Sequence, residues 1–207
     1  MRTPQFWLYA VLLFFYGFSF FSVQLHLAAY VTDLGISATN AAVVLTVMGG
    51  AIVCGQIGLG SAGDKIGYKR AFLLGAVLLS LGIFVLIFAR ELWTFYISAV
   101  LLGLAFGNCS TQESPLTAWL FGIGSHGHLF GFFVFCCTVG CGAGPVVSGF
   151  IFDRTGSYQF AFWLSAGISV ALIIMTTFLK SPTAVPTSRT GYVETVGAQP
   201  GRTSLPS

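Results

Sequence analysis

Six long apolar runs separated by short polar breaks make up the chain as far as residue 180. They cover about residues 6–30, 38–59, 71–89, 92–119, 129–151 and 158–179. A helix needs about 20 apolar residues to cross the core of a bilayer, and each run is close to that length or longer. The first run carries no charge and lacks the short apolar core of a secretory signal, so we expect it to be retained. The pattern predicts an all-α integral membrane protein with six transmembrane helices.

The composition excludes an ordinary soluble domain. Only 7% of the 207 residues are charged and 56% are hydrophobic, whereas soluble domains carry about 25% charged residues. The net charge of +3 is small and no long basic run is present, which argues against a nucleic-acid partner. Residues 181–207 are rich in Pro, Thr, Ser and Gly and hold one aromatic residue, Tyr192. We expect this segment to be a disordered cytoplasmic tail following a transmembrane bundle of residues 1–180.

An eight-residue phrase occurs twice in the chain. Residues 60–67 have the form Gly-x-x-x-Asp-(Lys/Arg)-x-Gly, and the same form returns at residues 149–156, displaced by 89 residues at every matching position. Three apolar runs lie between the copies, so the second copy is expected on the opposite side of the membrane. This arrangement is an inverted-topology repeat of two three-helix units, which is typical of secondary transporters. The alternative is that two Gly/Asp turns are alike by chance.

The basic residues predict the orientation of the chain. If the N-terminus is cytoplasmic, seven of the nine Lys and Arg residues lie inside, and only Arg90 and Arg154 lie outside. This distribution obeys the positive-inside rule. We therefore expect both termini to be cytoplasmic, in a cell (plasma or inner) membrane.

The five cysteines do not indicate a metal site. All of them lie inside apolar runs, their number is odd, and no pair has the spacing of a zinc knuckle. We expect them to be small apolar packing residues, and we predict neither a metal nor a cofactor.

Two motifs resemble those of a known family. The segment Gly60-x-x-x-Asp64-Lys65-x-Gly67-x-Lys69-Arg70 resembles the loop signature of the major facilitator superfamily at every fixed position. The segment Gly140-x-x-x-Gly144-Pro145-x-x-x-Gly149 resembles the glycine–proline helix motif of that family, with one extra residue before the last glycine. Residues 24–35 and 153–158 are most similar to its monocarboxylate and oxalate/formate antiporter branch. The resemblance covers about residues 5–180.

The resemblance implies half of a twelve-helix transporter, since the signals match helices seven to twelve. The implied function is a secondary active transporter, or the C-terminal half of one, that moves a small solute by alternating access, with a monocarboxylate or another organic anion as a candidate. Its expected partner is an N-terminal six-helix half or a second copy, and the sequence itself is either a truncated reading frame or a subunit. One alternative is an orphan half that does not transport without a partner. Another is an intramembrane enzyme with His26 and Glu113 as acid and base, which no nucleophile–base motif supports.

The resemblance also implies a gate at the first copy of the phrase. In that family the loop latches helices on the cytoplasmic side and is broken during alternating access. The residues expected to form this gate are Gly60, Asp64, Lys65, Gly67, Lys69 and Arg70, with Asp153 and Arg154 as its counterpart on the outer side. The alternative is a loop that only sets the orientation of the chain.

Polar residues inside the apolar runs are candidates for the solute or proton pathway, because such residues are costly in lipid. The candidates are Gln24, His26, Asn108, Thr111, Gln112 and Glu113. Glu113 is either a proton carrier or a carboxylate at headgroup level, and Gln24 is its counterpart at the 89-residue offset. His26 either titrates near neutral pH or lies at the outer rim. Asn108 and Gln112 either line a cavity or form interhelical hydrogen bonds.

Two further expectations concern histidines and the solute. His126 and His128 fall in a Gly/His-rich stretch that we expect to be a solvated loop. Organic-anion transporters of the resembling branch pair the carboxylate with a buried Arg or Lys, but neither residues 38–59 nor residues 129–151 contain one. An anionic solute therefore requires a cation from the missing half.

Overall fold

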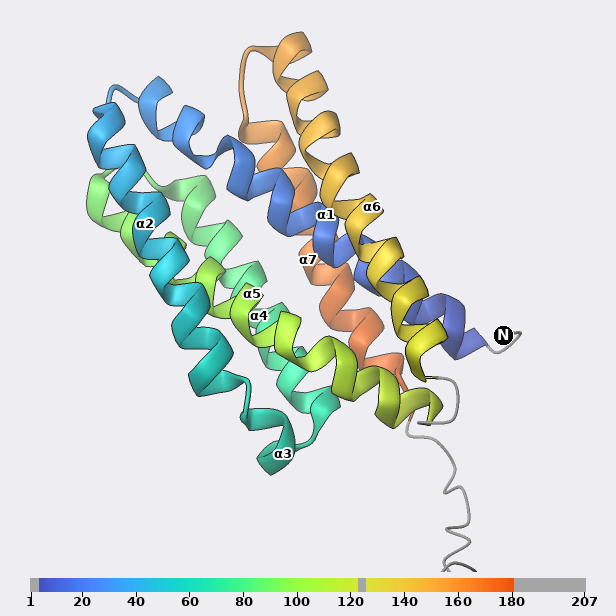
Figure 1. Ribbon diagram of the computed structural model, residues 1–207. Helices are drawn as coiled ribbons and strands as arrows, with labels where there is room; N and C mark the ends of the chain where they lie inside the picture. Colours follow the sequence, from blue (N-terminus) through green and yellow to red (C-terminus); the bar gives the residue numbers. More distant parts are fainter. Residues whose placement is uncertain (1–3, 123–125, 181–207) are drawn as a thin grey trace, which may run out of the picture.

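The computed structural model describes residues 4–122 and 126–180 as a bundle of helices (Figure 1). The elements are α1 (Pro4–Asp33), α2 (Ala38–Cys54), the π-helical turn η1 (Gly55–Leu59), α3 (Ala62–Ile66), α4 (Tyr68–Phe88), α5 (Leu92–Phe121), α6 (His126–Thr155) and α7 (Gln159–Phe178). Six helices are long and apolar enough to span a membrane, with η1 extending α2. The prediction of an all-α chain with six membrane-spanning helices is confirmed. The expected tail, residues 181–207, lies outside the described residues.

The stretch that contains His126 and His128 is helical, whereas a solvated loop was expected there. His126 is the first residue of α6 and His128 is also helical, so the loop predicted for them is wrong. The His126 ring stacks on Phe130, with 5.6 Å between centroids, and its Nε2 lies 3.2 Å from the hydroxyl of Ser114 on α5. An aromatic partner one turn along and a polar partner on α5 support a helix where composition alone favoured a loop.

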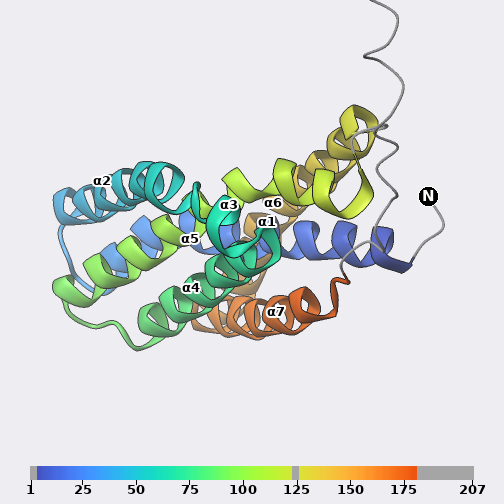
Figure 2. The ribbon, with the colours of Figure 1, turned by 90° about the horizontal axis from the view of Figure 1, so that it is seen from below.

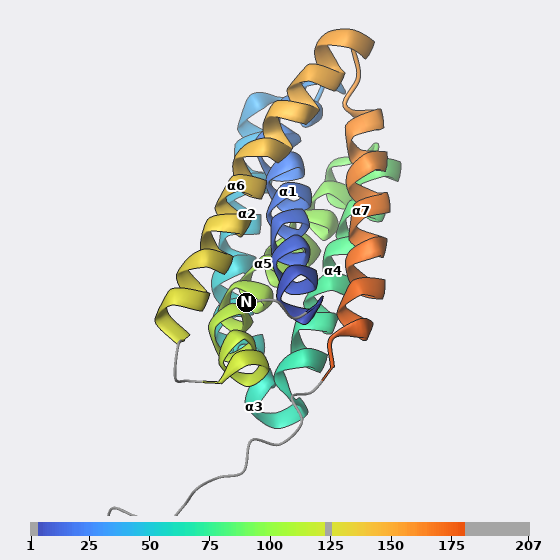
Figure 3. The ribbon, with the colours of Figure 1, turned by 90° about the vertical axis from the view of Figure 1, so that its right-hand side faces the viewer.

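Helices α1 and α5 form the centre of the bundle. α1 packs mainly against α6 and α7, and α5 packs against α4 and α2. Figures 2 and 3 show α2 and α6 on one side of this centre and α4 and α7 on the other. Only 22% of the residues in the most apolar stretch of α2, and 17% in that of α6, are buried, against 67% in α1. The side of the bundle formed by α2 and α6 is therefore the open one.

The contact between α1 and α6 depends on two glycines. Gly140 and Gly144 lie directly against the backbone carbonyls of Phe14 and Phe18, so that a side chain at either glycine would collide with α1. Small residues four apart let two helix backbones approach closely, which is a common way to pack helices in lipid.

The contact between α2 and α5 repeats this arrangement at an offset of 89 residues. Positions 14 and 18 of α1 correspond to Gly103 and Gly107 of α5, which lie against the backbone of α2. Positions 140 and 144 of α6 correspond to Ala51 and Gly55, which are among the contacts of those glycines. Since the same pairs of positions meet twice between the two repeats, the repeat extends to the packing, which chance likeness of two turns does not explain.

The two copies of the phrase lie at opposite ends of the bundle. Lys69 Nζ donates to the carbonyls of Thr177, at 2.7 Å, and Leu179, at 2.5 Å, so the first copy lies at the C-terminal end of α7. The second copy ends at Gly156, just before α7 begins, and hence at the other end. Figure 1 shows α3 at the lower end and the α6–α7 connection at the upper end. We call these the Lys65 end and the Arg154 end.

Each copy finishes on a glycine with a positive φ, which is 90° at Gly67 and 66° at Gly156. L-residues rarely adopt this conformation, and glycine adopts it without steric penalty. The shared glycine therefore has a structural reason: it turns the chain into α4 in the first repeat and toward α7 in the second.

Candidate functional site

Two buried amides of α5 hold the ends of the loop that carries the first phrase. Gln112 Nε2 donates to the carbonyl of Gly60 at 2.8 Å, and Asn108 Nδ2 donates to the carbonyl of Ala71 at 2.7 Å. Both side chains are almost fully buried. Because the residues are four apart, they lie on one face of α5 and span the loop from its start to the first turn of α4. Of the two roles expected for Asn108 and Gln112, the structure shows the hydrogen bonds to neighbouring elements. Their role in lining a cavity stays a prediction.

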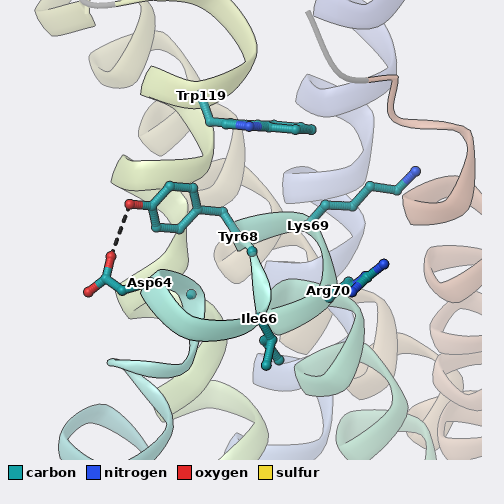
Figure 4. A pocket seen from close by; sticks show the side chains of 8 residues that line it. Asp64, Ile66, Tyr68, Lys69, Arg70 and Trp119 are labelled. Atoms are coloured by element: carbon teal, nitrogen blue, oxygen red, sulfur yellow. Dashed lines mark hydrogen bonds between the residues drawn. The ribbon is translucent and has the colours of Figure 1, made fainter.

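A cleft of about 510 Å³ lies at the Lys65 end, beside this loop (Figure 4). Its lining residues are Gly63, Asp64, Ile66, Gly67, Tyr68, Lys69, Arg70 and Trp119. Asp64 accepts a hydrogen bond from the Tyr68 hydroxyl at 3.0 Å, so its partner here is not Arg70. Figure 4 shows Lys69 and Arg70 extending away from this bond. The structure thus brings four expected gate residues, Asp64, Gly67, Lys69 and Arg70, to one cleft.

The other two expected residues of this gate lie beside the cleft. Gly60 receives the hydrogen bond from Gln112 described above, and Lys65 is exposed to solvent on α3. Neither lines the cleft.

A smaller cleft of about 290 Å³ lies at the Arg154 end. It is lined by Tyr30, Asp33, Leu34, Arg90, Gly156, Ser157, Tyr158 and Gln159. Burial raises the pKa of Tyr158 above its usual range, and the negative charges of Asp33 and Asp153 raise it further. The expected outer pair is not part of the lining: Asp153 and Arg154 are exposed, and the Arg154 guanidinium lies 4.7 Å from the centre of the Phe150 ring.

Glu113 lies where α1, α5 and α6 meet. The thiol of Cys137 on α6 is 3.9 Å from its carboxylate, and the Tyr9 hydroxyl on α1 donates to its backbone carbonyl at 3.1 Å. Its side chain is half-buried rather than sealed in the bundle. The carboxylate therefore contacts α6 through Cys137, while the backbone of Glu113 is bonded to α1, and an ionisable side chain at this depth is a candidate for a proton pathway.

Three other candidates have different surroundings. His26 Nε2 lies 3.1 Å from the carbonyl of Pro145 on α6, and its ring is 5.0 Å from the ring of Tyr158. Thr111 donates to carbonyls of its own helix, and Gln24 keeps a buried amide oxygen without a partner in the described part of the chain.

The geometry argues against His26 and Glu113 as an acid–base pair. His26 lies seven residues from the Arg154 end of α1, and Glu113 lies eight residues from the Lys65 end of α5. At a rise of 1.5 Å per residue, the two side chains are roughly 20 Å apart along the bundle. Groups at such a distance cannot exchange a proton with one substrate atom.

Two clusters of polar side chains are not among the residues predicted from the sequence. The hydroxyls of Ser22, Ser148 and Ser165 connect α1, α6 and α7 through buried hydrogen bonds. The hydroxyl of Tyr30 receives hydrogen bonds from Arg90 and Gln159. Serines within apolar runs give no periodic signal, but the 89-residue offset relates Tyr30 to Trp119 and Gln159 to Arg70, which links this group to the first cleft.

Comparison with known proteins agrees with the fold. A family profile described as Major Facilitator Superfamily matches residues 7–201. The chain is 27% identical over 180 residues to monocarboxylate transporter 7 of Homo sapiens, an alignment that covers 84% of this chain and 34% of that protein. The chain therefore spans about a third of the length of this curated relative.

Solved structures of larger proteins contain a similar arrangement of helices. Crystal structures of a mutant peptide transporter POT, one in complex with alafosfalin and one with sulfate, match with a TM-score of 0.73 and 19% sequence identity. Each match covers 83% of this chain and 37% of the other. At this level of identity the likeness concerns the fold alone.

Proposed function

The chain belongs to the major facilitator superfamily, and from this membership we propose that it is a secondary active transporter, or half of one, that moves a small solute by alternating access. The observation that carries the proposal is the inverted repeat. The glycine contacts between α1 and α6 recur between α5 and α2, and a cleft lies beside the phrase at each end of the bundle. A bundle with two related halves in opposite senses can expose a site to either side by a small change at its two ends.

A second six-helix unit completes the proposed transporter. α2 and α6 leave most of their surface open. Gly50 on α2, Gly58 on η1, and Gly131 and Gly142 on α6 have no neighbouring atoms within 4 Å of where a side chain would begin. Exposed glycines on a membrane helix suit the close approach of another helix. The partner is an N-terminal six-helix half or a second copy of the chain, and the solute passes between the two units.

The proposed gate is the cleft at the Lys65 end, which faces the cytoplasm together with both termini. Asp64, Lys65 and Arg70 form the charged part of this gate, and Asp153 and Arg154 stand at the corresponding place outside. The buried amides of Asn108 and Gln112 hold the loop in position on α5. A carboxylate and two cations on a loop held at both ends can exchange partners while the loop keeps its shape.

The proposed solute is a small organic anion such as a monocarboxylate. The similarity to a protein named as a monocarboxylate transporter supports this class. Residues 38–59 and 129–151 hold no Lys or Arg, so the cation that pairs with the anion comes from the second unit. Glu113 is the proposed proton carrier, and Gln24, His26 and Thr111 are further positions along the pathway.

Solute counterflow tests the proposal. The purified chain, alone and together with any six-helix partner that co-purifies, is placed in liposomes loaded with unlabelled formate, lactate or oxalate. We expect labelled solute outside to enter faster than into protein-free liposomes. Entry only with the partner present would favour the alternative of an orphan half. Entry no faster than into protein-free liposomes in either preparation contradicts the transport function for these solutes.

A further inference from the structure

The two clefts are counterparts under the inverted repeat. Five residues that line the cleft at the Arg154 end lie 89 positions from residues that line the cleft at the Lys65 end. The pairs are Tyr30 with Trp119, Gly156 with Gly67, Ser157 with Tyr68, Tyr158 with Lys69, and Gln159 with Arg70. The same part of each repeat therefore forms a cleft at each end of the bundle.

The hydrogen bonds that join neighbouring elements at the two clefts involve different residues. At the Arg154 end, the Tyr30 hydroxyl accepts hydrogen bonds from Gln159 Nε2 at 3.1 Å and from Arg90 Nη1 at 3.0 Å. At the Lys65 end, the counterparts Trp119 and Arg70 share no hydrogen bond (Figure 4), and hydrogen bonds there come instead from Lys69 Nζ, which donates to the carbonyls of Thr177 and Leu179. The cleft with the Tyr30 hydrogen bonds has a volume of about 290 Å³, and the cleft with the Lys69 hydrogen bonds has a volume of about 510 Å³.

The hydrogen bonds of Tyr30 at the Arg154 end join elements of both repeats. Tyr30 lies near the end of α1, Arg90 lies in the turn between α4 and α5, and Gln159 begins α7. Gln159 Nε2 also lies 3.4 Å from the carbonyl of Ile87, the last buried residue of α4. Tyr30 is 5% exposed, whereas Arg90 is exposed and Gln159 is half-buried, so the two hydrogen bonds are shielded from water on the Tyr30 side only.

We propose that Tyr30, Arg90 and Gln159 form a latch that keeps the Arg154 end of the bundle closed, and that this latch opens as the cleft at the Lys65 end closes. The inference rests on the proposed alternating access, since it assigns the latch to one of its two states. In the state in which the Arg154 end is open and the Lys65 end is closed, the Arg70 guanidinium lies over the Trp119 ring. A cation over an indole face is the favourable contact available to this pair, because the indole offers no hydrogen-bond acceptor.

Hydrogen–deuterium exchange of the full chain tests the latch with Tyr30→Phe. This change removes the acceptor of two hydrogen bonds and keeps the ring that packs edge-on against Phe95 and Phe162. Tyr96→Phe is the matched control, a half-buried tyrosine near the same end of α5. We expect exchange to rise about tenfold in residues 87–92 and 156–160, which corresponds to about 1.4 kcal/mol. Exchange in residues 63–70 falls at the same time, and the control changes neither segment.

The expected decrease in hydrogen–deuterium exchange in residues 63–70, at the Lys65 end, distinguishes a latch from a local packing role of Tyr30. A rise in residues 87–92 and 156–160 with no fall in residues 63–70 would show a structural role only and overturn the proposal, as would unchanged exchange at both ends. If Tyr30→Phe does not fold, Gln159→Met removes one donor at a half-buried position and is read in the same way.

Counterflow by the same preparations separates the latch from the proposed function. Wild-type protein without counterflow refutes transport of the solutes tested, while the reciprocal change in exchange still supports the latch. Counterflow by wild type without the reciprocal change refutes the latch alone.

Discussion

At the scale of single residues, the loop phrase is held by side chains that lie outside it. Gln112 and Asn108 project from α5 and bind carbonyls at the two ends of the loop. Because both amides are buried, we expect their substitution to lower the stability of the protein. A buried carbonyl that loses its donor cannot be hydrogen-bonded by water instead. The shape of the loop therefore depends on α5 as much as on the glycines within the phrase.

Gln112→Leu tests this dependence. We expect the substitution to lower the free energy of unfolding by about 1–3 kcal/mol, because the carbonyl of Gly60 loses its donor, and to make residues 58–67 more accessible to proteases. Thermal unfolding and limited proteolysis in detergent measure both effects. Gln56→Leu, at an exposed glutamine of the preceding turn, is the control and should leave both unchanged.

Asp64→Asn tests the gate. The amide keeps the size of the side chain but removes its charge, so partner exchange with Lys65 or Arg70 is lost. We expect the rate of counterflow to fall at least about tenfold, as loss of about 1.4 kcal/mol would produce, with normal insertion into the membrane. The control is Glu91→Gln, an exposed carboxylate outside both copies of the phrase. A variant at position 64 that transports at the wild-type rate would leave the loop with a role in orientation only.

Glu113→Gln tests proton coupling. The neutral amide can accept hydrogen bonds but cannot carry a proton. We therefore expect uptake driven by a pH gradient to fall at least about tenfold, while counterflow without a gradient continues. Equal losses in both assays would point to a packing role beside Cys137 instead.

At the scale of elements, the helices follow from the sequence and several of their ends do not. Apolar runs of membrane length predicted six helices, because a helix satisfies the backbone of each run internally, whereas the strands of a membrane barrel are shorter and alternate in hydrophobicity. The start of α6 was missed, since its support comes from Ser114 and Phe130 rather than from local composition. The short helix α3 inside the first phrase was also not expected, because three glycines in eight residues are typical of a turn.

The candidate site was predicted only in part. A repeated phrase pointed to the loop, and four of its residues line one cleft. The latch was missed because Tyr30 ends an apolar run as an ordinary interfacial tyrosine would, and its two partners come from distant segments. Contacts of that kind leave no local pattern, although the offset of 89 residues carried the information.

Gly144→Leu tests the packing of elements. The new side chain would collide with the carbonyl of Phe18, and α1 and α6 would have to move apart. We expect a loss of about 1–3 kcal/mol or more in stability, measured as a lower unfolding temperature, and a similar loss for Gly107→Leu at the corresponding contact of α2 with α5. Gly167→Leu on α7, which meets nothing within 4 Å, is the control and should change stability by no more than about 0.5 kcal/mol.

At the scale of the whole molecule, two three-helix units run in opposite senses and pack through equivalent contacts. The glycine pairs, the terminal glycines of the phrase and the two clefts all follow one offset of 89 residues. Such a molecule has related structures at its two ends, with a cleft of about 290 Å³ at the Arg154 end and one of about 510 Å³ at the Lys65 end.

The most direct test of this account is the side of the membrane on which each copy of the phrase lies. Ser61→Cys and Thr155→Cys place a thiol in an exposed position of each copy without altering a charge, in a chain whose five native cysteines are replaced. We expect a membrane-impermeant maleimide to label position 155 in intact cells, and to label position 61 only after the membrane is made permeable. Labelling of both positions from the same side would contradict the inverted arrangement in the membrane and the alternating access proposed from it.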